Sequence, residues 1–142
     1  MYCLQAMSEP TPRSTASAQL VVRDQDLASV LNFEPGDDFP PVFATSRMVA
    51  LMEVAAARLL IPHRGPGEMS VGTMVEIIHT AATPLGGTVT ATATFVGREG
   101  KLFVFEVAAR DNAGEIGRGT HKRAIVSSER LVAGASKRGP AA

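Results

Sequence analysis

The sequence predicts an α+β fold in which one long central helix is wrapped by a five-stranded antiparallel sheet. Three observations support it: one long apolar helical segment, four later segments with strand character, and short turns between those strands. The chain has 142 residues, 45% hydrophobic and 20% charged, which is enough for one domain with a sizeable core and too few for two ordinary domains.

The two ends of the chain differ in composition from the middle. Residues 1–17 are rich in Ser, Thr and Pro and indicate a disordered arm, while residues 129–142 indicate a loose C-terminal tail. The start lacks a basic region followed by an apolar run, so we do not expect a signal peptide. The domain is therefore expected over residues 18–128, and its first strand over AQLVVRD, residues 18–24.

The helix is expected in TSRMVALMEVAAARLL. Pro40 and Pro41 favour extended backbone before it, and Thr45 or Ser46 can serve as its N-cap. Pro62 and Gly65 should end it. These signals give a helix of about 16 residues, on the order of 24 Å long.

Four strands are expected after the helix. In GTVTATATFVG, Thr alternates with Val, Ala and Phe at period two, the pattern of a half-buried strand. A tight turn at Gly100 and the turn DNAG should join the last three strands as hairpins. The expected strands cover residues 69–83, 87–97, 101–111 and 115–127.

This order of elements predicts a hot-dog fold. Such a sheet leaves an edge strand and one face of the helix incompletely covered. We therefore expect a homodimer.

Charge and cysteine content exclude several classes of partner. Lys plus Arg equals Asp plus Glu, 14 against 14, so no net field attracts nucleic acid. No apolar run reaches 18 residues, so we expect no membrane partner. Cys3 is the only cysteine, which excludes internal disulfides and thiolate clusters and fits a cytoplasmic protein. His63 and His121 lack metal-ligand spacing, so no metal is expected.

Glu53 is an unusual residue in the helix. No other Asp or Glu occurs between Phe39 and Gly67, and Glu53 lies about 120–140° around the helix from Arg47 and Arg58. Its neighbours three and four residues away are Val and Ala, so no ion pair within the helix explains it. Glu53 is then either a solvated residue at the rim of the buried face or a carboxylate held in a cleft for chemistry.

Two further residues have a structural and a catalytic interpretation. His79 shares a strand face with Val75 and Ile77, where a histidine is either a satisfied core residue or a catalyst. Thr45 at the helix start is either a cap or a reactive hydroxyl. The residues alone do not decide between these interpretations.

Three segments carry a family resemblance: FPPVFATSRMVALMEVA, VGTMVEIIHTAATPLGGTVTATA and EIGRGTHKRAIV. Over residues 20–128 the chain resembles the fluoroacetyl-CoA thioesterases, a hot-dog family. The resemblance implies an active site of Thr45, Glu53 and His79.

The same resemblance implies supporting residues and an assembly. The oxyanion-side glycine of the family falls on Gly72, and its cation near the CoA-binding edge falls on Arg123. The family also has an aromatic pair in the loop before the helix, of which Phe39 matches one while Gly36 replaces the other. The resemblance further implies a homodimer with sites at the subunit interface, and no cofactor, since CoA is part of the substrate.

The predicted function is therefore hydrolysis of a small acyl-CoA thioester to the free acid and CoA. Glu53 would attack the carbonyl carbon or act as a general base on water, and the Gly72 N–H would stabilise the oxyanion. Without the second ring, at Gly36, selectivity for a fluorinated acetyl group is not expected. The alternatives are a non-catalytic acyl-CoA-binding module and a hot-dog hydratase or dehydratase, although the D-x₄-H pattern of the latter is absent.

Overall fold

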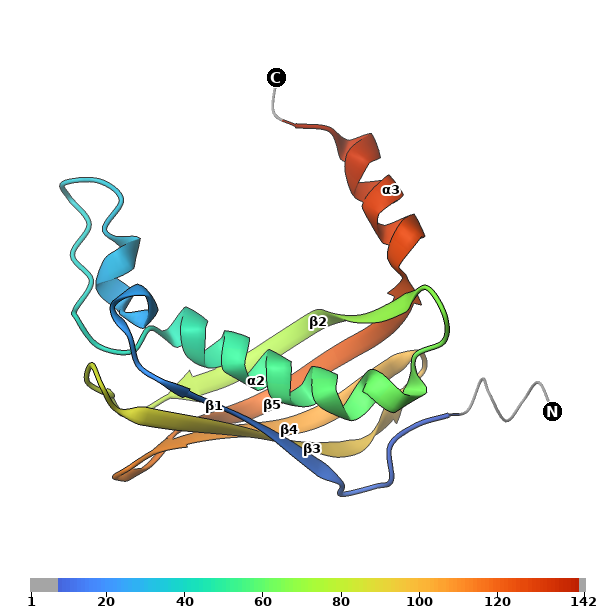
Figure 1. The fold of residues 1–142 in the computed structure, drawn as a ribbon, viewed down its shortest axis with the longest axis horizontal. Coiled ribbons are helices and arrows are strands. Elements are labelled where there is room, and N and C mark those ends of the chain that lie inside the picture. The colour runs from blue at the N-terminus through green and yellow to red at the C-terminus, as the bar shows by residue number, and fades with distance from the viewer. Residues whose placement is uncertain (1–7, 141–142) are drawn as a thin grey trace.

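One long helix lies against a curved antiparallel sheet in the computed structural model, which describes residues 8–140 (Figure 1). The order along the chain matches the prediction: a strand, the helix, then four strands. The elements are β1 Thr15–Val21, η1 Asp24–Asp26, η2 Ala28–Leu31, α2 Thr45–Leu60, η3 Ile61–His63, β2 Glu68–His79, β3 Thr88–Glu99, β4 Leu102–Asp111, β5 Gly114–Ser127 and α3 Ser128–Arg138.

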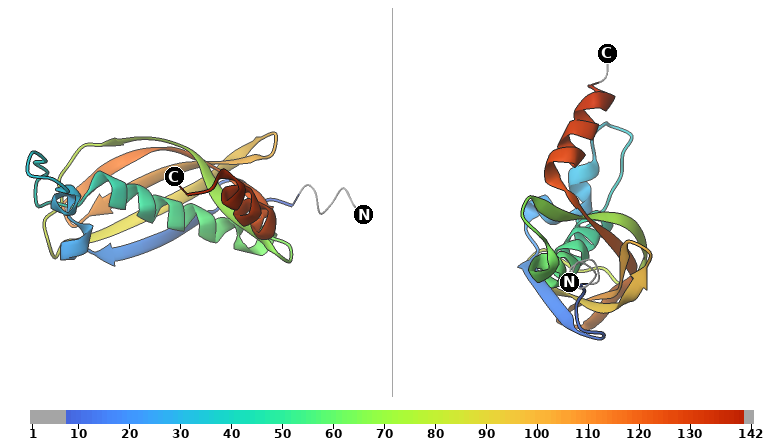
Figure 2. Two further views of the ribbon diagram at one scale, coloured as in Figure 1. Left: turned by 90° about the horizontal axis from the view of Figure 1, so that it is seen from above. Right: turned by 90° about the vertical axis from the view of Figure 1, so that its right-hand side faces the viewer.

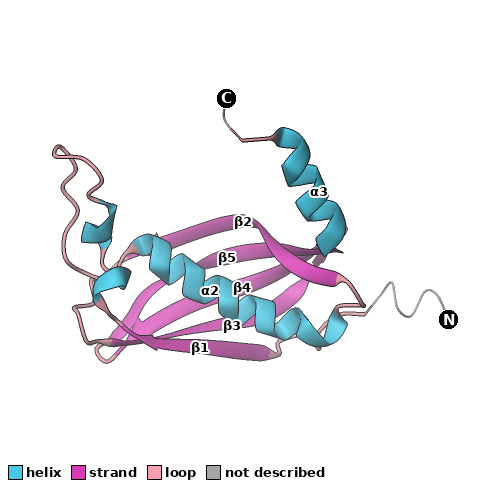
Figure 3. Ribbon diagram, turned by 45° about the horizontal axis from the view of Figure 1, so that its top comes forward, coloured by secondary structure: helices cyan, strands magenta, loops and turns pink. Residues whose placement is uncertain are grey.

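The five strands form one sheet in the order β1-β3-β4-β5-β2, and every neighbouring pair is antiparallel. Figures 2 and 3 show the sheet curving around α2, which confirms the predicted architecture. Strands β1 and β2 are the two edges. On β2, three large apolar side chains are exposed at this edge: Met69, Val75 and Ile78.

Helix α2 begins and ends close to the predicted positions. Its N-cap is Ala44, with φ −72° and ψ 142°, and no side chain caps it, so the predicted capping role of Thr45 or Ser46 is wrong. The Thr45 hydroxyl bonds a side chain on β2 instead. At the other end, Pro62 lies in the 3₁₀ turn that follows Leu60, as expected for a residue that cannot continue the helix.

The core lies between α2 and the inner face of the sheet. Along β3, alternate residues from Val89 to Phe95 are fully buried, as the period-two pattern predicts. Small side chains in this row leave room for the helix to pack closely. The helix contributes Met48, Leu51, Met52, Ala55, Ala56 and Leu60.

A bulge interrupts the pairing of β2 with β5 between Gly72 and Met74. The extra residue is Thr73, whose hydroxyl donates to the Lys122 carbonyl (3.1 Å). Because of it, Gly72 and Val75 both lie opposite inward-facing residues of β5, although they are three positions apart. Gly72, at the start of the bulge, lies beside Glu53 in the middle of α2.

The hairpin turns also agree with the prediction. Gly100 joins β3 to β4 with φ +58°, a conformation that favours glycine. Gly114, with φ +136°, is the first residue of β5 and directly follows the turn from β4.

The ends of the domain differ from the prediction. Residues 15–17 belong to β1 and pair with β3, so the ordered region begins earlier than residue 18. Residues 1–7 of the expected disordered arm lie outside the described residues.

The tail expected from residue 129 is instead the helix α3, which projects away from the sheet (Figure 1). Ser127 caps it by accepting a hydrogen bond from the Arg130 N–H (3.2 Å), a local signal that composition alone did not reveal. Among the described residues, no helix is both long and apolar enough to span a membrane.

Candidate active site

Two groups of polar side chains lie along the boundary between α2 and β2. One is the Thr45–His79 pair, at the start of the helix and the end of the strand. The other is the Glu53 cluster, which we define as Glu53, Ser70, Gly72, His121 and Arg123.

In the Thr45–His79 pair, Thr45 Oγ1 is 2.8 Å from His79 Nδ1. The other ring nitrogen, His79 Nε2, is buried and has no hydrogen-bond partner among the described residues. The pair lines a pocket of about 370 Å³ together with Phe39 and other residues of the loop before α2. A buried nitrogen without a partner, beside a pocket, is suited to bind a substrate or water.

Glu53 does not point freely into solvent. Its Oε1 accepts a hydrogen bond from Arg123 Nη1 (3.1 Å), and 41% of its side chain is exposed. Its second oxygen, Oε2, has no hydrogen-bond partner in the part of the chain that the structure describes. The carboxylate is therefore held by one oxygen and presents the other.

Gly72 makes this position of Glu53 possible. A Cβ at residue 72 would collide with Glu53 Oε1 and would lie 3.2 Å from His121 Cε1. Only a glycine allows the carboxylate to lie against the β2 backbone. Gly72 thus adjoins the carboxylate of Glu53.

Arg123 is part of this cluster and is not a cation at the molecular surface. Only 6% of the residue is exposed. Its Nε donates to Ser70 Oγ and its Nη2 to the Ser70 carbonyl, both at 3.0 Å. Burial lowers the pKa of Arg123 and the charge of Glu53 offsets part of that effect. Arg123 therefore does not fit the expected contact with CoA phosphates, because a phosphate would have to displace these bonds.

His121 belongs to the Glu53 cluster, although it is not among the active-site residues predicted from the sequence. It is 1% exposed and lies 4.0 Å from Glu53 Oε1 through Nε2. Burial lowers the pKa of His121, the hydrogen bond to the Met74 carbonyl raises it in part, and the net pKa lies below the usual value. The available signal was its place two residues before Arg123, which puts both on the same strand face.

The two loop positions named in the sequence analysis have different surroundings. Phe39 lines the pocket beside the Thr45–His79 pair. Gly36 lies in a turn closed by a hydrogen bond from Asp37 N–H to the Glu34 carbonyl, and no atom of the described residues lies within 4 Å of a Cβ built on it. A Cβ at residue 36 would therefore meet no steric obstacle among the described residues.

A buried carboxylate anchors the loop to the start of α2. Asp26 is fully buried, its carbonyl accepts the Ala44 N–H (2.9 Å), and its carboxylate pairs with Arg47 (2.7 Å) and Arg23 (3.3 Å). Burial raises the pKa of Asp26, but hydrogen bonds from the Arg23 N–H and both guanidinium groups lower it below the usual value. Asp26 therefore fixes the backbone just before Thr45.

The two groups are not in contact within one protomer. Thr45 and Glu53 are eight residues apart on α2, which separates them by about 12 Å along the helix axis. The structure thus brings together Thr45 with His79, and Glu53 with Gly72 and Arg123, but it does not join these sets in one chain.

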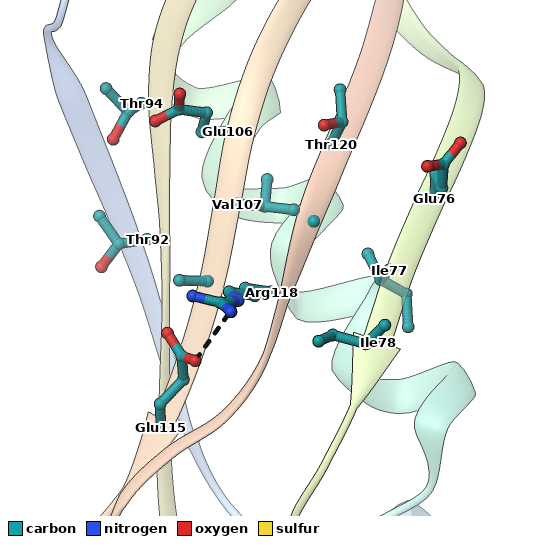
Figure 4. Close-up of a pocket in the computed structure, with 12 residues that line it drawn as sticks. Glu76, Ile77, Ile78, Thr92, Thr94, Glu106, Val107, Glu115, Arg118 and Thr120 are labelled. Carbon is teal, nitrogen blue, oxygen red and sulfur yellow. Dashed lines mark ion pairs between the residues drawn. The ribbon is translucent and has the colours of Figure 1, made fainter.

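A larger hollow of about 500 Å³ lies on the outer face of the sheet, away from α2 (Figure 4). It is lined by β2, β3, β4 and β5, and an ion pair between Glu115 and Arg118 (3.8 Å) lies across it. None of Thr45, Glu53 and His79 lines it. Among residues 8–140, no group of three His, Cys, Asp or Glu side chains is arranged to hold a metal ion.

Comparison with known proteins gives a consistent result. The family described as fluoroacetyl-CoA-specific thioesterase matches residues 22–129. The fluoroacetyl-CoA thioesterase of Streptantibioticus cattleyicolor is 47% identical over 104 residues, which cover 73% of this chain and 75% of that protein.

Solved structures extend the similarity to the fold. A fluoroacetyl-CoA thioesterase superposes with a TM-score of 0.87 and 38% identity, covering 94% of this chain and all of that one. A thioesterase superfamily member from Thermus thermophilus superposes with a TM-score of 0.81 and 27% identity, covering 92% and 94%.

Proposed function

Because this chain belongs to the fluoroacetyl-CoA-specific thioesterase family and is an acyl-CoA thioesterase, we propose that Thr45, Glu53 and His79 are its catalytic residues. The observation that carries this assignment is the placement of Glu53 against Gly72, with one carboxylate oxygen fixed by Arg123 and the other without a hydrogen-bond partner among residues 8–140. Family membership does not favour the two alternatives, a binding module without chemistry and a hydratase or dehydratase.

Hydrolysis requires a nucleophile, an oxyanion donor and a proton for the leaving group. In the general-base route, Glu53 takes a proton from water as the water oxygen bonds to the carbonyl carbon. The Gly72 N–H stabilises the negative oxygen, the C–S bond breaks, and His79 delivers a proton to the CoA thiolate. In the nucleophilic route, a Glu53 oxygen bonds to the carbonyl carbon, the C–S bond breaks to release the CoA thiolate, and water then cleaves the resulting mixed anhydride to the free acid and the Glu53 carboxylate. Thr45 orients the His79 ring in both routes.

The complete site is proposed to form in a homodimer. The edge of β2 exposes Met69, Val75 and Ile78, and an unpaired apolar edge is suited to pair with a second copy. A two-fold axis at this edge makes the two β2 strands antiparallel. The Thr45–His79 end of each protomer then approaches the Gly72 region of the other, which would bridge the separation within one chain.

The substrate is proposed to be a small acyl-CoA thioester, with CoA as part of the substrate and no separate cofactor. The relatives are named for fluoroacetyl-CoA, and one solved structure of such a thioesterase contains fluoroacetate and CoA. Gly36, in place of an aromatic residue, supports a broader acyl range here. The single cysteine, Cys3, supports a cytoplasmic location.

The activity test follows free thiol released from acyl-CoA esters of increasing chain length. Glu53→Gln should keep the melting temperature and lower turnover at least about 10²-fold, the lower range for a positioned acid–base group. Glu129→Gln, the same change on the exposed helix α3, is the matched control and should match the parent. Parent-like turnover by Glu53→Gln would contradict the assignment.

The shared site has a separate test by subunit exchange. When inactive Glu53→Gln and His79→Gln proteins are mixed, each heterodimer regains one intact site. Random exchange should then restore about a quarter of the parent activity. If each protomer held its own complete site, mixing would restore nothing.

A further inference from the structure

His121 lies at the centre of the Glu53 cluster and is buried. Its ring packs against Phe105 of β4 with ring centroids 6.4 Å apart, and its two nitrogens contact β2 and β5. Both contacts have fixed donor or acceptor character, so the protonation of the ring can be worked out.

The first contact determines whether Nδ1 of His121 carries a hydrogen. His121 Nδ1 lies 2.8 Å from the Met74 carbonyl, which only accepts hydrogen bonds, so Nδ1 carries a hydrogen. Met74 directly follows the extra residue of the β2 bulge. The bulge therefore supplies the carbonyl that sets the tautomer.

The second contact determines whether Nε2 of His121 carries a hydrogen. His121 Nε2 lies 3.1 Å from Arg123 Nη1, and a guanidinium only donates, so Nε2 must hold a lone pair. The ring is thus neutral, with its hydrogen on Nδ1. A protonated Nε2 would direct a second positive charge at Arg123.

The contacts of Arg123 show what this lone pair does. Arg123 Nη1 has two hydrogens, of which one goes to Glu53 Oε1 and the other to His121 Nε2. Nε and Nη2 of Arg123 donate to Ser70. Together with these bonds, the hydrogen bond to His121 Nε2 fixes the plane of the guanidinium.

We propose that neutral His121 is a positioning residue, which holds the Arg123 guanidinium so that it fixes the catalytic carboxylate of Glu53. This inference rests on the proposed catalytic role of Glu53. His121 itself touches no substrate in this arrangement and acts only through Arg123.

Two conservative variants separate this role from simple packing. The amide of Asn reproduces the position of Nδ1 and keeps the bond to Met74, whereas the amide of Gln reaches the position of Nε2 and offers an oxygen to Arg123. We expect His121→Asn to lower kcat about tenfold or more, the effect of losing one charge-assisted hydrogen bond. KM should change by less than about threefold, because no ground-state contact is removed. His121→Gln should recover most of kcat.

If His121 only fills space, both variants should lose stability and activity to a similar degree, and this outcome would overturn the inference. Parent-like kcat in His121→Asn, with Glu53→Gln inactive, would overturn it while leaving the proposed function intact. A Glu53→Gln enzyme with parent-like turnover would reject the proposed catalytic role of Glu53 itself.

The native protein provides a readout that needs no variant. Imidazole ¹⁵N shifts of His121 near pH 7 should show a neutral ring with the hydrogen on Nδ1. A hydrogen on Nε2, or a charged ring, would overturn the proposal even if neither variant folds.

Discussion

Replacing Gly72 with Ala should lower turnover strongly and stability only moderately, because it displaces the carboxylate of the Glu53 cluster. The added Cβ would collide with Glu53 Oε1 and would also lie 3.4 Å from Arg123 Nη1. Arg123 and His121 are buried and held by several hydrogen bonds, whereas the Glu53 side chain is 41% exposed. Glu53 is therefore the group that moves, and its carboxylate should turn away from Arg123.

The magnitudes follow from this displacement. Inserting one methyl group into a packed site costs about 1–3 kcal/mol, which lowers Tm by about 3–9 °C in a domain of this size. Turnover should fall about 10²-fold, as for loss of a positioned acid–base group. Adding a Cβ leaves the backbone N–H of residue 72 in place. The loss of turnover would therefore reflect the displaced Glu53 carboxylate and not the loss of an oxyanion donor.

The assay pairs thermal unfolding with release of free thiol from acetyl-CoA, and the control is Gly97→Ala. Gly97 also adjoins a bulge, but a Cβ there meets no atom of residues 8–140 within 4 Å and its φ is ordinary. The control should stay within about ±0.5 kcal/mol of the parent and keep full turnover. A Gly72→Ala enzyme with parent turnover would show that the observed position of the carboxylate is not needed for chemistry.

Two further changes test the loop before α2. Asp26→Asn should destabilise the protein by about 1.5–3 kcal/mol at neutral pH, since it weakens hydrogen bonds to charged groups. Because the folded-state pKa of Asp26 lies below its ordinary value of 3.8, the parent gains this stability above that value and loses it as pH falls through the folded-state pKa. The difference between parent and variant should therefore shrink in acid unfolding curves below about pH 4, and a constant difference would contradict the argument. Gly36→Phe should narrow the acyl range toward small groups, because a ring there would seal the loop; a strong preference for fluoroacetyl-CoA in the parent would show that the missing ring does not matter.

The position of Glu53 illustrates what a local pattern predicts. Helix periodicity placed it away from Arg47 and Arg58, and the structure places it at the boundary of α2 and β2. Alternation along the strand likewise placed His79 on the inner face, opposite Gly117 of β5. Both predictions depend on the fixed geometry of a single element, which a sequence specifies.

Local sequence signals gave wrong predictions where the same residues suit two different structures. Thr45 is a good N-cap by residue type, but its hydroxyl bonds His79, 34 residues later in the chain. The composition of residues 129–142 predicts a loose tail, whereas a single capping serine and helix-forming residues are enough for α3.

By itself, the sequence determined the fold class, the order of the elements and the faces on which Glu53 and His79 lie, because backbone periodicity is a local property. Only the tertiary structure assigned Arg123 to Glu53, 70 residues away, and brought His121 into the same cluster. Those contacts depend on strand pairing and on the bulge at Thr73, which sets how β2 faces α2. No single segment encodes that register, because it arises from how the whole sheet packs around the helix.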